Sequence, residues 1–179
     1  MHQRYAPFLK DDLDTYNLTS ETIEFDPTMS FVGDLLIRDT EKDKWEFDRT
    51  TLLTISGDKV KTIKIRVDWS NYSLTDTDFS TLLIPETDKL FFGAKSFWGI
   101  IDLKNIKINR QESCMEFLSF ERHSDCIVAI TELTAESLTL QGDTIDNVPI
   151  DPPFESKDFA DRIEFNSPVY GQQILKLKK

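Results

Sequence analysis

The stretch from Lys89 to Leu103, KLFFGAKSFWGIIDL, is the most aromatic and least charged part of the chain. It predicts two short strands, at residues 90–92 and 97–101, joined by residues 93–96. A loop of about three to five residues that contains glycine commonly connects the strands of a β-hairpin. The aromatic and aliphatic side chains of this stretch cannot all remain in water. We therefore expect the hairpin to lie in the core and other strands to pack against it.

Polar and apolar side chains alternate most clearly along residues 60–69. The apolar side chains that point to one face are those of Ile63, Ile65, Val67 and Trp69. Such alternation is typical of a strand with one buried and one solvated face, and it recurs in short segments from about residue 21 to residue 140. The chain is thus predicted to be all-β, folded as a single antiparallel β-barrel or β-sandwich with at most one or two short helices.

The length of 179 residues fits one domain that spans residues 1–179. Residues 1–20 are predicted to form an N-terminal arm or a short helix, because Leu9, Leu13 and Tyr16 have helical spacing. Residues 142–168 contain prolines, many acids and little periodicity. This second segment is predicted to be a long acidic loop.

Two further regions resemble the small barrels of the lipocalin-like (calycin) family. KWEFDRTTLLTISGDKVKTIKIRVDW is similar to their early meander, and CIVAITELTAESLTLQG with the later QILKLKK is similar to their closing strands. The resemblance implies a barrel with an interior cavity, and it implies no catalytic residues. As an alternative function, such a barrel would hold a small apolar ligand. The candidate lining residues are Trp69, Phe91, Phe117 and Leu140.

The net charge of −11, with a sequence pI near 4.6, bears on the class of partner. An acidic surface repels phosphate backbones and anionic lipid headgroups, so neither nucleic acid nor a membrane is an expected partner. A basic protein is favoured, because opposite fields steer association. The alternative is that the charge serves solubility alone.

Cysteine and histidine are scarce: the cysteines are Cys114 and Cys126, and the histidines are His2 and His123. There is no Cys-x-x-Cys pair, so we expect no metal site and no cofactor. The cysteines lie on adjacent predicted strands, where they could pair or remain buried free thiols; free thiols fit a cytosolic protein. His123 beside Cys126 could be a nucleophile–base pair, or a turn histidine beside a structural cysteine. We favour the second reading and predict no enzymatic activity.

The N-terminus lacks an apolar segment followed by a small-residue cleavage site, and no run has the apolar length of a transmembrane helix. We therefore expect a cytoplasmic protein. The alternative is an exported protein whose signal has been removed.

Acidic residues gather in two segments. The candidate partner-binding residues are Asp39, Glu41, Asp43, Glu46 and Asp48 in the first, and Asp143, Asp146, Asp151, Glu155, Asp158 and Asp161 in the second, with Tyr72 and Tyr170 as aromatic anchors. The sequence thus favours an acidic protein-binding domain, such as an immunity protein that inhibits a basic toxin. Toxins that cut nucleic acids tend to be basic because they bind phosphate.

Overall fold

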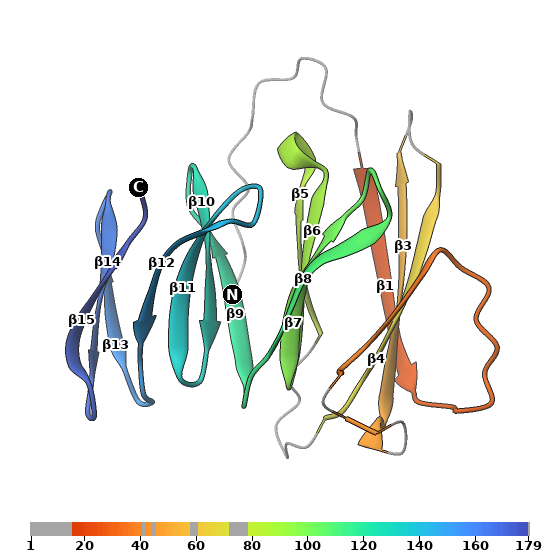
Figure 1. The fold of residues 1–179 in the computed structure, drawn as a ribbon, viewed down its shortest axis with the longest axis horizontal. Helices are drawn as coiled ribbons and strands as arrows, with labels where there is room; N and C mark the ends of the chain where they lie inside the picture. Colours follow the sequence, from red (N-terminus) through yellow and green to blue (C-terminus); the bar gives the residue numbers. More distant parts are fainter. Residues whose placement is uncertain (1–15, 41, 44–45, 58–60, 72–78, 179) are drawn as a thin grey trace.

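Four small β-sheets follow one another along the chain and stand in a row (Figure 1). The structure is a computed structural model that describes residues 16–40, 42–43, 46–57, 61–71 and 79–178. Within these ranges there is no α-helix, and one turn of 3-10 helix, Pro85–Thr87, follows the fifth strand. The prediction of an all-β, mainly antiparallel fold is confirmed.

The first sheet has the strand order β1-β3-β4-β2. Its strands are β1 (Tyr16–Glu24), β2 (Leu35–Arg38), β3 (Arg49–Gly57) and β4 (Ile63–Trp69). β2 runs parallel to β4, and the other two pairings are antiparallel. β4 confirms that residues 63–69 form a strand, but the solvated face predicted for it is wrong: Arg66 and Asp68 on that face are buried and form an ion pair over 2.6 Å.

The second and third sheets are antiparallel meanders of four strands each, in sequence order. The second comprises β5 (Ser80–Ile84), β6 (Lys89–Ala94), β7 (Phe97–Asp102) and β8 (Lys107–Ser113). The third comprises β9 (Phe117–Arg122), β10 (Cys126–Thr131), β11 (Thr134–Thr139) and β12 (Thr144–Pro149). The fourth sheet has three strands, β13 (Glu155–Asp158), β14 (Arg162–Ser167) and β15 (Gly171–Lys176), in the order β13-β14-β15.

Three hydrophobic clusters lie between successive sheets and hold the row together. The first joins strands of the first and second sheets through residues such as Val67 and Phe92. The second joins the second and third sheets, and the third joins the third and fourth sheets. Every residue of β6, β7 and β10 is buried. The central hairpin therefore lies in the core, as its composition predicts.

The prediction of a single barrel or sandwich is not confirmed, because none of the four sheets closes on itself within the described residues. The physical reason is that the second sheet buries both faces. Phe92 packs against the first sheet, while its neighbour Phe91 packs against the third. A barrel wall has one inner and one outer face, which a continuously apolar strand does not fit.

The predicted loop at residues 142–168 contains three strands, β12, β13 and β14, and that prediction is wrong. The prolines lie where strands end or turn: Pro149 ends β12, Pro152 and Pro153 lie between β12 and β13, and Pro168 follows β14. Proline lacks an amide hydrogen and so interrupts the hydrogen bonds of a sheet only when it lies in the interior of a strand. Proline residues at strand ends and in turns are therefore compatible with strands.

The prediction of an N-terminal arm or helix at residues 1–20 is wrong for its last five residues, which form a strand. Residues 16–20 belong to β1, where Tyr16 pairs with Gly57 and Ser20 with Leu53. The rest of that segment lies outside the described residues. In the part of the chain that the structure describes, no helix is long and apolar enough to cross a membrane.

Candidate protein-binding surface

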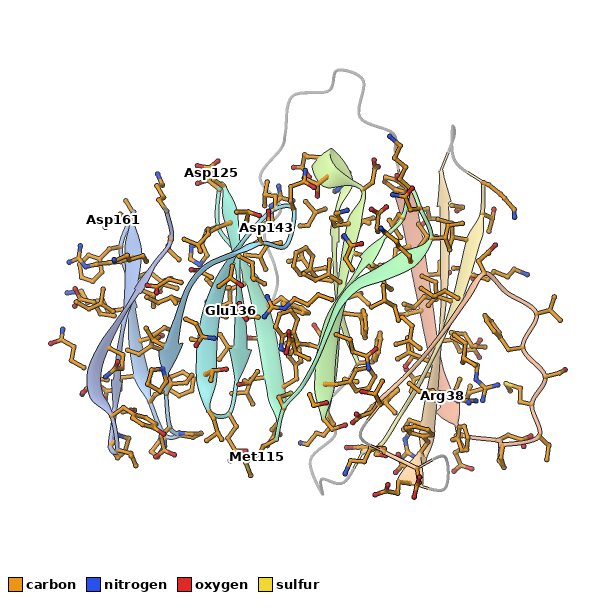
Figure 2. All side chains as sticks on the ribbon, viewed as in Figure 1. Arg38, Met115, Asp125, Glu136, Asp143 and Asp161 are labelled. Atoms are coloured by element: carbon orange, nitrogen blue, oxygen red, sulfur yellow. The ribbon has the colours of Figure 1, made fainter. Side chains whose placement is uncertain are left out.

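Because the strands are antiparallel, their turns alternate between two opposite ends of the row. One end, here called the Met115 end, consists of residues 94–97, 113–117, 131–134, 149–155 and 167–171. The other, here called the Asp143 end, consists of residues 85–88, 103–106, 122–126, 139–144 and 158–162. Met115 lies opposite Asp125, Asp143 and Asp161 in Figure 2.

Backbone hydrogen bonds connect neighbouring turns of the Met115 end within the second and third sheets, and one bond, from the Phe117 amide to the Lys95 carbonyl over 2.9 Å, joins these two sheets. The Cys114 amide donates to the Ser96 carbonyl over 2.8 Å, and the Glu132 amide donates to the Glu116 carbonyl over 2.8 Å. The Ile150 amide donates to Leu133 over 2.9 Å. Turns joined in this way present a preformed surface, which lowers the entropy that a partner must overcome on binding.

Large apolar side chains are exposed at this end. The exposed fractions are 71% for Met115, 40% for Leu133, 67% for Val169 and 44% for Tyr170. A single exposed apolar residue is ordinary, whereas several at one end of a small protein indicate a binding surface. Tyrosine and methionine are also enriched in protein interfaces.

The charge of the Met115 end is acidic. Its turns contain the carboxylates of Glu116, Glu132, Asp151 and Glu155, and their one basic side chain is that of Lys95. Lys95 is buried and forms an ion pair with Glu116. The surface therefore combines apolar anchors with uncompensated negative charge.

The Asp143 end lacks exposed apolar anchors in the part that the structure describes. Among the described residues, none of the large exposed apolar side chains lies in its turns. It has acids, but basic residues partner some of them. Arg122 forms an ion pair with Glu86 over 2.5 Å, and Arg162 pairs with Asp161 over 3.2 Å. This end resembles an ordinary solvated surface.

The acidic residues at 39–48 that were predicted to bind a partner differ in their exposure to solvent. Asp39 is 2% exposed and accepts a hydrogen bond from the Ser96 hydroxyl over 2.6 Å, so it orders the Met115 end instead of facing a partner. Asp43, Glu46 and Asp48 are exposed in the connection to β3, beside that end. The predicted residues Glu41 and Tyr72 lie outside the described residues.

The acids predicted at residues 143–161 are divided between the two ends. Asp151 and Glu155 lie at the Met115 end together with Tyr170, whereas Asp143, Asp158 and Asp161 lie at the Asp143 end. Asp146 lies on β12, where its carboxylate accepts a hydrogen bond from the Lys176 amide over 2.9 Å. The structure therefore does not bring the two predicted acidic segments into one surface.

The candidate ligand-lining residues also lie in two different hydrophobic clusters. Trp69 belongs to the cluster between the first and second sheets. Phe91, Phe117 and Leu140 belong to the cluster between the second and third sheets, where Phe91 and Phe117 each contact the ring of Phe120. The four residues do not line one common space.

Neither cysteine has the environment of a nucleophile. Both thiols are free. Burial, reinforced by Asp39 and Glu116, raises the pKa of Cys114 to about 12, and burial likewise raises the pKa of Cys126. A thiol held protonated does not attack substrates. Among the described residues, no three His, Cys, Asp or Glu side chains could hold a metal ion.

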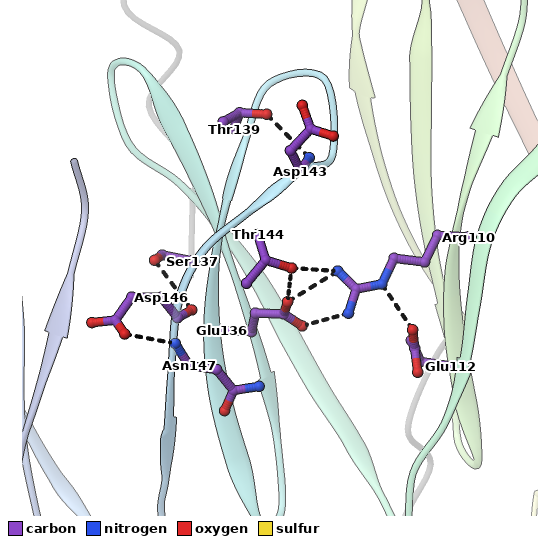
Figure 3. A network of polar contacts seen from close by, with 9 residues as sticks. All are labelled: Arg110, Glu112, Glu136, Ser137, Thr139, Asp143, Thr144, Asp146 and Asn147. Carbon is purple, nitrogen blue, oxygen red and sulfur yellow. Dashed lines mark hydrogen bonds and ion pairs between the residues drawn. The ribbon is translucent and has the colours of Figure 1, made fainter. Parts of the chain in front are cut away.

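A polar network that the sequence did not predict joins the second and third sheets (Figure 3). Arg110 of β8 binds both carboxylate oxygens of Glu136 on β11, each over 3.0 Å, and donates to Glu112 over 2.9 Å. Its guanidinium lies 4.8 Å from the centre of the Trp98 ring. The network borders an open hollow of about 510 Å³, and because its charges satisfy one another we assign it a structural role.

Sequence reasoning also missed Met115, Leu133 and Val169. The signal for Val169 was present, because Val169 and Tyr170 directly follow Pro168 and precede Gly171, which is turn chemistry. Large apolar residues inside a turn have no core to fill. Met115 and Leu133 gave no such signal, because the sequence predicts strands over residues 114–120 and 126–133, which include them.

Comparison with known proteins shows little similarity. No protein family matches the chain, and none of the curated proteins matches it. The chain is similar in structure to Hsv2 of Kluyvelomyces marxianus, a β-propeller, with a TM-score of 0.36 and 8% identity. The match covers 70% of this chain and 46% of that chain, so it spans about half the length of Hsv2. A likeness this low carries no argument about function, and the resemblance to lipocalin-like barrels finds no support in these comparisons.

Proposed function

We propose that this protein is a non-enzymatic binding domain that captures a basic protein at its Met115 end. The observation that carries the proposal is the concentration of exposed apolar side chains there, at Met115, Leu133, Val169 and Tyr170. Anchors of this kind supply most of the affinity of an interface, while surrounding charges speed association and exclude wrong partners.

The charge of −11 favours a partner of opposite sign. Toxin domains that cleave nucleic acids fit this description, because their active sites must attract phosphate. An inhibitor gains from the same attraction, which raises the association rate. We therefore propose an immunity role, in which the domain binds such a toxin and blocks its access to nucleic acid.

The experiment begins with the gene next to that of this protein. If it encodes a secreted protein with a basic C-terminal domain, that domain is purified and titrated against this protein by calorimetry at low and physiological salt. We expect a complex in which Met115→Ala combined with Tyr170→Ala weakens affinity at least tenfold, since each truncation of an anchor typically costs about 1–2 kcal/mol.

Two pairs of charge substitutions make a matched control. Glu132→Gln with Asp151→Asn acts at the Met115 end, and Asp143→Asn with Asp161→Asn acts at the other end. Each double variant removes two negative charges, so the two variants change the long-range electrostatic field of the protein by the same amount. We expect the first pair to lower the association rate more than the second. Equal effects of the two pairs, or no binding at low salt, would refute the proposal.

A further inference from the structure

Met115 is the most exposed sulfur-containing side chain among the described residues. It lies in the turn between β8 and β9, at one end of the row in Figure 2, and is 71% exposed. Met29 is partly buried, and its carbonyl accepts a hydrogen bond from Arg66 over 2.9 Å. Of these two thioethers, that of Met115 is therefore the one that a dissolved reagent reaches first.

The two cysteine thiols do not compete with Met115 for an oxidant. Oxidants react with the thiolate, whose population falls as the pKa of the thiol rises. Burial, reinforced by Asp39 and Glu116, raises the pKa of Cys114 to about 12. Cys126 is 2% exposed, and burial raises its pKa as well. Both thiols stay protonated at neutral pH, so the thioether of Met115 is the more reactive sulfur.

The backbone on both sides of Met115 is fixed. The Cys114 amide donates to the Ser96 carbonyl over 2.8 Å, and the Phe117 amide donates to the Lys95 carbonyl over 2.9 Å. The Met115 side chain belongs to none of the three hydrophobic clusters of the described structure. A chemical change at its sulfur therefore alters the surface and leaves the turn and the core in place.

Met115 has an apolar neighbour in the next turn of the same sheet. The Glu132 amide donates to the Glu116 carbonyl over 2.8 Å, which brings residues 113–117 and 131–134 together. Met115 precedes Glu116, and Leu133, which is 40% exposed, follows Glu132. The two apolar residues thus flank one hydrogen bond, and both present apolar surface at the Met115 end.

We propose that Met115 is a site of reversible oxidation, and that its sulfoxide weakens the binding surface at the Met115 end. The oxidant is an electrophilic oxygen donor such as hypochlorous acid. A lone pair of the Met115 Sδ attacks the oxygen, so that the S–O bond forms and the O–Cl bond breaks. Chloride leaves with the bonding electron pair, and the proton passes to water. Sulfur thereby loses the two electrons that the oxidant gains.

A methionine sulfoxide reductase reverses the step. Two thiols supply two electrons and two protons, the sulfoxide oxygen leaves as water, and the thiols become a disulfide. The thioether of Met115 is restored. The modification therefore acts on the binding surface as a switch that can be reset.

The effect on binding rests on the function proposed above. The thioether is a weak hydrogen-bond acceptor, whereas oxidation turns the apolar side chain into a polar one. A partner that covers Met115 removes water from the sulfoxide oxygen and leaves it unpaired. We expect oxidation to weaken the complex roughly tenfold or more, because an unpaired buried acceptor opposes binding.

The first test needs no partner. The purified protein is treated with less than one equivalent of hypochlorous acid, and mass spectrometry of its proteolytic peptides locates the added oxygen. We expect Met115 to gain one oxygen before Met29, Cys114 or Cys126, with no change in the midpoint of thermal unfolding. Earlier oxidation of any of the other three, or unfolding of the protein oxidised at Met115, would overturn the proposal.

The second test titrates the basic domain used to test the proposed function, and it compares each variant with its own untreated sample. We expect oxidation to weaken binding by the wild type and by the matched control Met29→Leu, and sulfoxide reductases to restore it. Met115→Leu is expected to bind equally well before and after treatment with the oxidant.

The outcomes separate this inference from the proposed function. No loss in the oxidised wild type, or an equal loss in oxidised Met115→Leu, would overturn the inference alone. Absence of binding by the untreated wild type would refute the proposed function and, with it, the effect of oxidation on binding.

Discussion

At the scale of single residues, Asp68 is the most constrained charge in the described structure. It is fully buried on β4 and accepts hydrogen bonds from Arg66 over 2.6 Å, Arg38 over 2.9 Å and Thr50 over 2.9 Å. Arg66 is itself 2% exposed and donates to the Met29 carbonyl over 2.9 Å. Removal of the carboxylate would leave a buried guanidinium without its counter-charge.

We therefore expect Asp68→Ala to lower the free energy of unfolding by about 3 kcal/mol or more. Urea denaturation measures the change. Asp161→Ala is the matched control, because that carboxylate is 68% exposed in its ion pair with Arg162 and its loss should have little effect. Equal effects of the two substitutions would contradict this account of the first sheet.

Asp102 gives a prediction about pH. Burial opposes its charge, but hydrogen bonds from the Asn105 amide and the Lys89 ammonium outweigh burial and lower the pKa to about 2. A depressed pKa contributes stability above the unfolded value near 4, and this stability is lost as the pH falls toward 2.

The stability difference between the wild type and Asp102→Asn should therefore shrink by about 2 kcal/mol between pH 5 and pH 2. Urea denaturation at several pH values within the folded range follows the trend. A difference that stays constant over that range would show that the folded protein does not favour the ionised carboxylate.

At the scale of elements, the neighbours of β7 leave no room for a side chain at Gly99. A Cβ atom at this position would lie 2.7 Å from the Arg110 carbonyl oxygen of β8 and 2.7 Å from the Phe92 ring of β6. The carbonyl belongs to the backbone and cannot move aside as a flexible side chain could.

Gly99→Ala should lower the free energy of unfolding by about 1–3 kcal/mol, the usual cost of overpacking. Thermal and urea denaturation measure it, with Ser113→Ala, at an exposed position of β8, as the control. If Gly99→Ala left the free energy of unfolding unchanged, β7 and β8 would lie further apart than described.

Also at the scale of elements, strands could be predicted from the sequence where polar and apolar residues alternate clearly. They could not be predicted where proline residues indicated a loop. The strand at Ile63–Trp69 could be predicted because apolar and polar residues alternate along it, whereas the burial of Arg66 and Asp68 on its polar face, as an ion pair, gave no signal in that pattern. Residues 142–168 were assigned wrongly because Pro149 and Pro168 mark the limits of strands, whereas they were read as interrupting any strand. The short exposed β13 has no apolar period that could reveal it.

For the whole molecule, the decisive signal was the lack of alternation in residues 89–103. A strand that is apolar on both faces must lie between two other layers. Phe91 and Phe92 pack against different sheets, and CIVAIT in β10 repeats the pattern. Two such strands, far apart in sequence, favour a row of sheets over a barrel. The binding surface was harder to foresee, because it depends on which turns share an end.

The central claim is that a basic partner docks at the Met115 end, and a hydrogen-exchange footprint of the complex tests it most directly. We predict slowed exchange in residues 113–117, 131–134 and 167–171, with residues 139–144 and 158–162 unchanged. Slowed exchange confined to the latter two segments would contradict the account.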